Sequence, residues 1–337
     1  MGNLPSSLSD GNEGAHLTDP LRISAIRRAR RLSARLPTRW DRLLRELGKF
    51  AIDYRGARST GIRGLLFRAL GRYSPVVAAR YGDGMILVDA SDQEIGRTVF
   101  MRGEYERLYL AEALEYLRRL PGASEPGPVF VDVGANIGIS TLDALLHFGF
   151  KEAVCFEPDS RNFRLLRMNL ILNDLEDRVA THRMALSDSD GSGTIEWAPG
   201  NFGDSRLVTG ESPVGSEREV VATRRLDGLV ADGALDLQRT GLVWIDTQGY
   251  DPYVLAGARS VLEAGIPVVV EYWPQGLASS GGFELFEELV AANFEVMVDL
   301  RRRCEGAGDG GVMPAAEVAR LRERYVGGEF TDLLLLG

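Results

Sequence analysis

Two acidic residues flank a glycine-containing loop near the middle of the chain, and each ends a short apolar run. Asp132 lies in VFVDV (129–133), two residues before Gly134, and Glu157 lies in AVCFEP (153–158). Glycines at such a place permit a tight turn and bring backbone N–H groups close to a ligand. A carboxylate in the position of Glu157 can accept both hydroxyls of a ribose. The two acids could instead cap the helices that follow, but their pairing around one loop favours cofactor binding.

The details of this loop distinguish between cofactors. A dinucleotide fingerprint counted from Gly134 requires glycines where the chain has Asn136 and Ile139. A Walker loop would need a lysine, which is missing here. Asp132 would repel a pyrophosphate, but it suits a ligand that carries an ammonium or sulfonium group. S-adenosylmethionine has both cations and no phosphate, so the loop predicts this cofactor.

The elements that must position these residues alternate along the chain. Five short apolar or β-branched runs lie at 129–133, 153–158, 179–186, 241–246 and 267–273. Segments with helical patterning separate most of them, at 136–148, 159–173 and 252–264. Two further strand candidates lie at 294–300 and 330–337, and the long interval 187–240 predicts a hairpin insertion. This alternation predicts a doubly wound α/β fold around a mostly parallel, seven-stranded, Rossmann-like sheet.

The N-terminal part of the chain has a different character. Residues 1–20 have the composition of a disordered tail, and 21–80 are interpreted as a basic helical extension before the domain at 81–337. Within the extension, 21–72 carry a net charge of +12, whereas 73–337 carry −18. We favour packing of this arm on its own acidic domain or on a second copy in a homo-oligomer. A membrane surface is the alternative partner, and nucleic acid is a less favoured one.

A lead-in and a linker precede the first strand of the domain. Residues 81–100 predict a short hairpin, 104–120 a helix, and PGASEPGP (121–128) a Pro/Gly linker. No run approaches the 18 to 20 apolar residues of a membrane-spanning helix. The two cysteines cannot build a zinc site or a disulfide framework, and the three histidines are scattered. These features predict a cytoplasmic protein.

Four segments together resemble the FkbM-type methyltransferase family, a branch of the class I methyltransferases. They are VDVGANIGIST, FEPDSRNFRLLRMNL, MALSDSDGSGT and WIDTQGYDPYVLAGA. The resemblance covers roughly 83–337, including Gly103-Glu104-Tyr105-Glu106 in the lead-in. The family's usual I-D-V-E-G-x-E pattern is replaced here by Asp246, Gln248, Gly249 and Asp251.

The resemblance implies methyl transfer from S-adenosylmethionine to a hydroxyl of a sugar, polysaccharide or secondary metabolite. It also defines the residues that we expect to contact the cofactor: Asp132, Gly134, Ala135, Asn136, Gly138, Glu157, Pro158, Ala185, Leu186 and Asp246. The competing classes are an NAD-dependent oxidoreductase or epimerase, and a non-catalytic cofactor-fold module with a membrane- or nucleic-acid-binding arm.

Three carboxylates are the candidates for catalysis. Asp246 and Glu271 stand at the ends of neighbouring predicted strands, and Asp251 follows Asp246 within about one turn. Ligands bind at this edge of such sheets. An aliphatic hydroxyl needs either a base as the bond forms or a divalent cation that lowers its pKa. Each acid could instead hydrogen-bond the cofactor or cap a helix, and a metal is not favoured because no second oxygen ligand follows Asp246 or Glu271.

Aromatic residues cluster near the same edge. They are Tyr250, Tyr253, Tyr272 and Trp273. They could form a stacking wall for a sugar ring, but aromatic residues near strand ends belong more often to the core.

Overall fold

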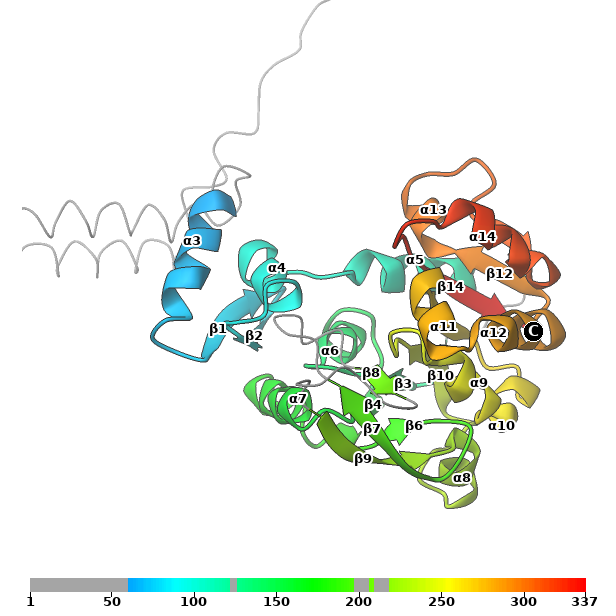
Figure 1. Ribbon diagram of the computed structural model, residues 1–337, viewed down its shortest axis with the longest axis horizontal. Helices are drawn as coiled ribbons and strands as arrows, with labels where there is room; N and C mark the ends of the chain where they lie inside the picture. Colours follow the sequence, from blue (N-terminus) through cyan, green and yellow to red (C-terminus); the bar gives the residue numbers. More distant parts are fainter. Residues whose placement is uncertain (1–59, 122–125, 197–205, 209–217) are drawn as a thin grey trace, which may run out of the picture. The chain divides into compact units, whose positions relative to one another are not determined.

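The computed structural model describes residues 60–121, 126–196, 206–208 and 218–337 (Figure 1). The chain divides into two compact units, Met1–Ile62 and Arg63–Gly337, and all the described strands belong to the second. The predicted tail and most of the predicted basic extension lie outside the described residues. Within the described ranges, no helix combines the length and the apolar character needed to cross a bilayer.

A large sheet of eight strands forms the centre of this second unit (Figure 1). Its order is β13 (Val312–Pro314), β12 (Val296–Asp299), β14 (Thr331–Leu336), β11 (Val268–Tyr272), β10 (Thr240–Ile245), β3 (Val129–Val133), β4 (Glu152–Phe156) and β5 (Val179–His182). The strands from β5 to β11 are parallel, and β14 runs antiparallel between β11 and β12. The predicted fold class is confirmed, with an eighth strand because 312–314 pairs with β12 at the edge.

Helices connect the parallel strands where the pattern predicts them. They include α6 (Ile139–Leu146) after β3, α7 (Ser160–Leu172) after β4, and α9 (Asp251–Ala256) with α10 (Arg259–Glu263) after β10. The single helix predicted over 252–264 is wrong, because the helix is interrupted at Gly257. A Cβ at Gly257 would collide with the carbonyl oxygen of Ser187, so the backbone is pressed against a neighbouring loop there.

The insertion forms a second, four-stranded sheet. Its order is β6 (Ala185–Leu186), β9 (Arg218–Arg224), β7 (Gly191–Glu196) and β8 (Arg206–Val208). The predicted hairpin is confirmed in the antiparallel pair β7 and β9. The continuous strand predicted over 179–186 is wrong: β5 ends at His182, and Ala185–Leu186 pairs with β9 instead.

The lead-in differs in its boundaries from the prediction. The hairpin consists of β1 (Val76–Tyr81) and β2 (Gly84–Asp89), and helix α4 (Ile95–Arg102) follows it. Helix α5 (Arg107–Arg119) confirms the helix predicted over 104–120. Helix α3 (Thr60–Leu70) precedes the hairpin, and its Phe67 is fully buried beside Phe100.

Two cores cover the two faces of the central sheet, because successive side chains of a strand point to opposite faces. Phe130 and Trp244 pack with α5, α6 and α7, whereas Val131 and Val243 pack with α9, α10 and α12 (Phe283–Asn293). On the α5 side, the acids of several strands share one face. Asp132 is in register with Trp244, and Glu271 with Asp332. The topology thus places polar groups from several strands on the face covered by α5.

Candidate active site

The loop after β3 is glycine-dependent because it packs on the end of β10. Gly134 has φ +85°, and a Cβ there would collide with the carbonyl oxygen of Asp246. Gly138 has φ +92° and caps α6, where a Cβ would approach Leu166 Cδ1 to 2.7 Å. Both positions combine a left-handed backbone with a close contact, so only glycine fits without strain.

The amide groups of this loop are already used within the protein. The N–H groups of Gly134 and Ala135 both donate to the carbonyl oxygen of Phe156, at 2.9 and 3.0 Å. The N–H of Asn136 donates to Glu157 Oε2 at 2.7 Å. The expected approach of these three amides to a ligand is therefore not seen. A pyrophosphate would find no free donors at them, which counts against the dinucleotide-binding alternative.

Glu157 joins the loop after β3 to the loop after β4. Besides the bond from Asn136, its Oε1 accepts the N–H of Asp159 at 2.8 Å, and the side chain is buried. Burial raises the pKa of Glu157 to about 8, against the effect of these two hydrogen bonds. The carboxyl group therefore holds the loop through two hydrogen bonds, and binding of a hydrogen-bond donor or a cation would favour its ionised form.

A first cavity of about 540 Å³, counting the solvent space at its mouth, opens beside Glu157. Its lining includes the predicted cofactor residues Gly134, Asn136, Glu157, Pro158, Ala185, Leu186 and Asp246. Apolar side chains that the sequence alone did not identify complete the wall, namely Phe156, Met184, Ile195 and Leu207, together with Tyr250, one of the aromatic residues expected near this edge. Part of this wall comes from the second sheet. The short apolar runs of the insertion give only a weak indication of how these strands pair.

A second cavity opens on the α5 side of the same loop. Its lining includes the predicted residues Asp132, Gly134, Ala135, Asn136 and Asp246. It also contains residues to which the sequence alone assigned no role, namely Tyr105, Glu106, Trp244 and Asp332. The two cavities share Gly134, Asn136 and Asp246, so they meet at the tip of the loop after β3. Gly138 lines neither cavity, and its role is to end the loop at the start of α6.

Asp132 faces the second cavity and not the first. Its Oδ2 accepts the hydroxyl of Thr141 at 2.5 Å, and the side chain is buried. Burial raises the pKa of Asp132 to about 7, and Asp246 contributes in the same direction. The hydroxyl of Thr141 also lies 3.0 Å from Cys155 Sγ, so Cys155 is a packed core thiol.

Of the three candidate catalytic carboxylates, Asp246 alone lines the cavities. Its Oδ1 accepts the side-chain amide of Gln248 at 2.8 Å. Asp251 is fully buried, and its two oxygens accept the N–H groups of Thr247 at 3.2 Å and Gly249 at 2.9 Å. Asp251 thereby fixes the loop that carries Asp246 and Gln248.

Glu271 is buried opposite Asp332 on the antiparallel neighbour strand. Its Oε2 has no hydrogen-bond partner among the described residues. Burial raises the pKa values of Glu271 and Asp332 well above their usual range, and the other acids of the cluster add to this effect. Within the described part of the chain, no three His, Cys, Asp or Glu side chains are arranged to hold a metal ion.

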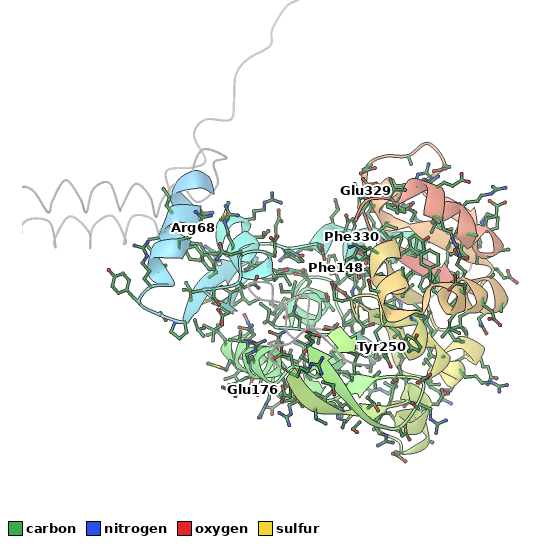
Figure 2. The ribbon with its side chains drawn as sticks, viewed as in Figure 1. Arg68, Phe148, Glu176, Tyr250, Glu329 and Phe330 are labelled. Carbon is green, nitrogen blue, oxygen red and sulfur yellow. The ribbon has the colours of Figure 1, made fainter. Side chains whose placement is uncertain are left out.

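The aromatic residues near this edge separate into two groups. Tyr250, labelled in Figure 2, lines the first cavity and lies within 3.1 Å of the Ser187 hydroxyl. Its ring stacks on Tyr253 with a centroid distance of 4.5 Å. Tyr272 is fully buried against Phe286, so it belongs to the core and not to a ligand wall.

Comparison with known proteins identifies the family. The family model described as the methyltransferase FkbM domain matches residues 132–294. The chain is 27% identical over 201 residues to the 2-O-methyltransferase NoeI of Sinorhizobium fredii, covering 54% of this chain and 78% of that protein. It is 30% identical over 177 residues to methyltransferase sdnD of Sordaria araneosa, covering 44% of this chain and 68% of that protein.

A third relative is the 31-O-demethyl-FK506 methyltransferase FkbM of Streptomyces tacrolimicus. The two chains are 32% identical over 124 residues, which cover 36% of this chain and 42% of that protein. The chain belongs to the FkbM-type methyltransferase family.

Proposed function

We propose that this chain transfers the methyl group of S-adenosylmethionine to a hydroxyl of a small-molecule or carbohydrate acceptor. The observation that carries this proposal is the junction of two cavities at Asp246, one beside Glu157 and one beneath α5. A group-transfer enzyme needs two adjoining sites, one for the donor and one for the acceptor. The names of two relatives, a 2-O-methyltransferase and a 31-O-demethyl-FK506 methyltransferase, support an oxygen acceptor.

The donor set of the first cavity suits this cofactor. Glu157 offers carboxylate oxygens to ribose hydroxyls, and apolar side chains such as Phe156 and Ile195 suit a purine. Asp246 supplies negative charge at the junction, where an ammonium group would be stabilised, and Asp132 adds to this charge from the second cavity. When bound, S-adenosylmethionine supplies an electrophilic methyl group on a sulfonium.

The chain's own residues then have to position the acceptor. Asp246 lies at the junction and can orient a hydroxyl, while Asp251 holds the loop after β10 in place. Glu271 lies behind these groups without lining either cavity. In this proposal Asp246 contacts the reactants, whereas Asp251 and Glu271 act through it by fixing its position and its charge.

The test is transfer of a labelled methyl group from S-adenosylmethionine to a panel of methyl glycosides and aliphatic alcohols, with and without EDTA. We expect an O-methyl product and S-adenosylhomocysteine in equal amounts, with activity retained in EDTA. Asp246→Ala should lower kcat at least about 10²-fold, whereas Asp174→Ala, at an exposed turn away from both cavities, should not. Transfer to an amine assayed alongside the panel, with none to any of its hydroxyls, would contradict an oxygen acceptor.

A further inference from the structure

Glu106 occupies an unusual position at the start of α5. It is the N-cap residue of this 13-residue helix, with φ 50° and ψ 8°, and its side chain makes no capping hydrogen bond. An acid at an N-cap ordinarily accepts a backbone N–H of the first turn. A left-handed backbone at a residue other than glycine also costs free energy that the surroundings must offset. Glu106 therefore serves something other than the helix.

The side chain of Glu106 lines the second cavity together with Asp246 and Asp332. Glu106 is exposed to solvent where it lines this cavity. Titratable groups face it from four elements: Tyr105 and Tyr109 at α5, Asp246 after β10, Glu271 on β11 and Asp332 on β14.

Among the described residues, no salt bridge joins a basic side chain to Glu106, Asp246, Glu271 or Asp332. Arg107 is the one basic side chain that lines the cavity in the described part of the chain, and its Nε donates to Asp143 Oδ1 at 2.7 Å. Behind the cavity, the buried Glu271 leaves Oε2 without a hydrogen-bond partner among the described residues. Carboxylates this close are unfavourable when all are ionised, so the cluster favours the uptake of a proton or the approach of a positive group.

From this arrangement we infer that Glu106 is the acceptor-side catalytic carboxylate, which faces the donor's methyl group and receives the proton of the acceptor hydroxyl. The inference rests on the proposed function. In the step, the hydroxyl oxygen forms the new O–CH₃ bond while the S–CH₃ bond breaks. The hydroxyl proton passes to the Glu106 carboxylate and then leaves to solvent through the open mouth. No oxidant, metal or further reactant is required.

This role separates the two acids at the reaction centre. Asp246 accepts a hydrogen bond from Gln248 and lines both cavities, so in this proposal it orients the acceptor hydroxyl toward the donor. Glu106 belongs to the acceptor cavity alone and carries no capping bond that would have to break. Desolvation of its carboxyl group among the neighbouring side chains, together with the charge of Asp246, raises the pKa of Glu106 to about 7 against the effect of a hydrogen bond with Tyr105, which suits a group that takes up and releases a proton near neutrality.

The decisive experiment needs no acceptor. Calorimetry measures the affinity of the full chain for S-adenosylmethionine, whose sulfonium is positive, and for S-adenosylhomocysteine, whose sulfur is neutral. A carboxylate that faces the sulfonium methyl favours the charged ligand. Glu106→Gln should therefore lower the ratio of the affinity for S-adenosylmethionine to the affinity for S-adenosylhomocysteine about five- to tenfold, while leaving S-adenosylhomocysteine binding unchanged. The ratio should rise with pH through neutrality in the wild type and rise less steeply in the variant, in which Asp132 and Glu157 still titrate.

Glu104→Gln is the matched control, because Glu104 is exposed two residues earlier and does not line the cavity. An unchanged ratio in Glu106→Gln would overturn the inference, since the charge would then lie elsewhere. Failure of the wild type to bind either ligand would instead overturn the proposed function. With any hydroxyl acceptor that the wild type methylates, Glu106→Gln should reduce kcat at least about 10²-fold and raise KM for the donor by no more than about the same five- to tenfold factor.

Discussion

The backbone N–H of Asn136 donates a 2.7 Å hydrogen bond to Glu157 Oε2, so the loop after β3 is fastened to the end of β4 by a residue expected to bind the cofactor. This bond couples the shape of the glycine loop to the charge of the site. A change at Glu157 therefore alters both cofactor binding and the loop itself.

Glu157→Gln should weaken binding of S-adenosylhomocysteine by at least about tenfold and lower the Tm. The amide cannot accept through both of its atoms, so either Asn136 or Asp159 loses its partner, at a cost of roughly 1–3 kcal/mol. Thermal denaturation and calorimetry measure the two effects. Glu176→Gln, at an exposed position labelled in Figure 2, is the control and should change neither. Full affinity in Glu157→Gln would show that the first cavity is not the cofactor site.

Cofactor affinity should depend on pH. The pKa values of Asp132 and Glu157 are raised to about 7 and about 8, so both carboxyls are substantially protonated below neutrality. Binding of a cationic ligand favours the ionised forms, and the affinity for S-adenosylmethionine should rise at least about fivefold between pH 6.5 and pH 8.5. Calorimetry in buffers of different ionisation enthalpy should detect proton release on binding. Constant affinity without proton release would contradict the buried-carboxyl account.

The same groups should affect stability in the opposite direction. Unfolded carboxyls lose their protons near pH 4, whereas the folded Asp132 and Glu157 keep theirs up to about 7 and 8. Across this interval the folded state binds more protons, so the contribution of these groups to the free energy of unfolding falls as pH rises. Without ligand, the Tm should decline from pH 5.5 to pH 8.5, and saturating S-adenosylmethionine should reduce that decline. A ligand-free Tm that climbs over this range would oppose the prediction.

Gly134→Ala should destabilise the protein and abolish cofactor binding, since the new Cβ meets the carbonyl oxygen of Asp246. Gly149→Ala is a matched control, because Gly149 has nearly the same φ, +86°, with open space around it. The free energy of unfolding of the control should fall only by the cost of an alanine in the left-handed region, about 1–2 kcal/mol. Urea denaturation measures both variants, and equal losses would show that the loop does not press on β10.

Truncation should locate the start of the folded unit at α3. Phe67 is buried and packs on Phe100 with a centroid distance of 5.2 Å, so removing 1–72 also removes a core side chain. A chain that begins at residue 60 should bind S-adenosylhomocysteine with wild-type affinity. One that begins at residue 73 should lose about 3–5 kcal/mol, as for deletion of a buried phenylalanine. Equal stability of the two truncated chains in urea would refute this boundary.

The strands, the loop after β3 and Glu157 could be predicted because their signals are local. Apolar runs, glycines and acids at strand ends lie within a few residues of one another, as in 129–138. The break at Gly257 could not be predicted, since its cause is a contact with Ser187 that lies far away in the sequence. Glu106 and Asp332 were missed for the same reason: antiparallel pairing and the entry of α5 bring them to Asp246 from outside the βαβ units.

The most direct test of the account is a parallel thermal-shift measurement of the full chain with S-adenosylhomocysteine, NAD and an RNA oligonucleotide. A ligand that binds only the folded state raises the Tm, and the two cavities that meet at Asp246 predict this rise for S-adenosylhomocysteine alone. A rise of several degrees that is lost in Glu157→Gln is the expected result. A rise with NAD or RNA and none with S-adenosylhomocysteine would contradict the central claim.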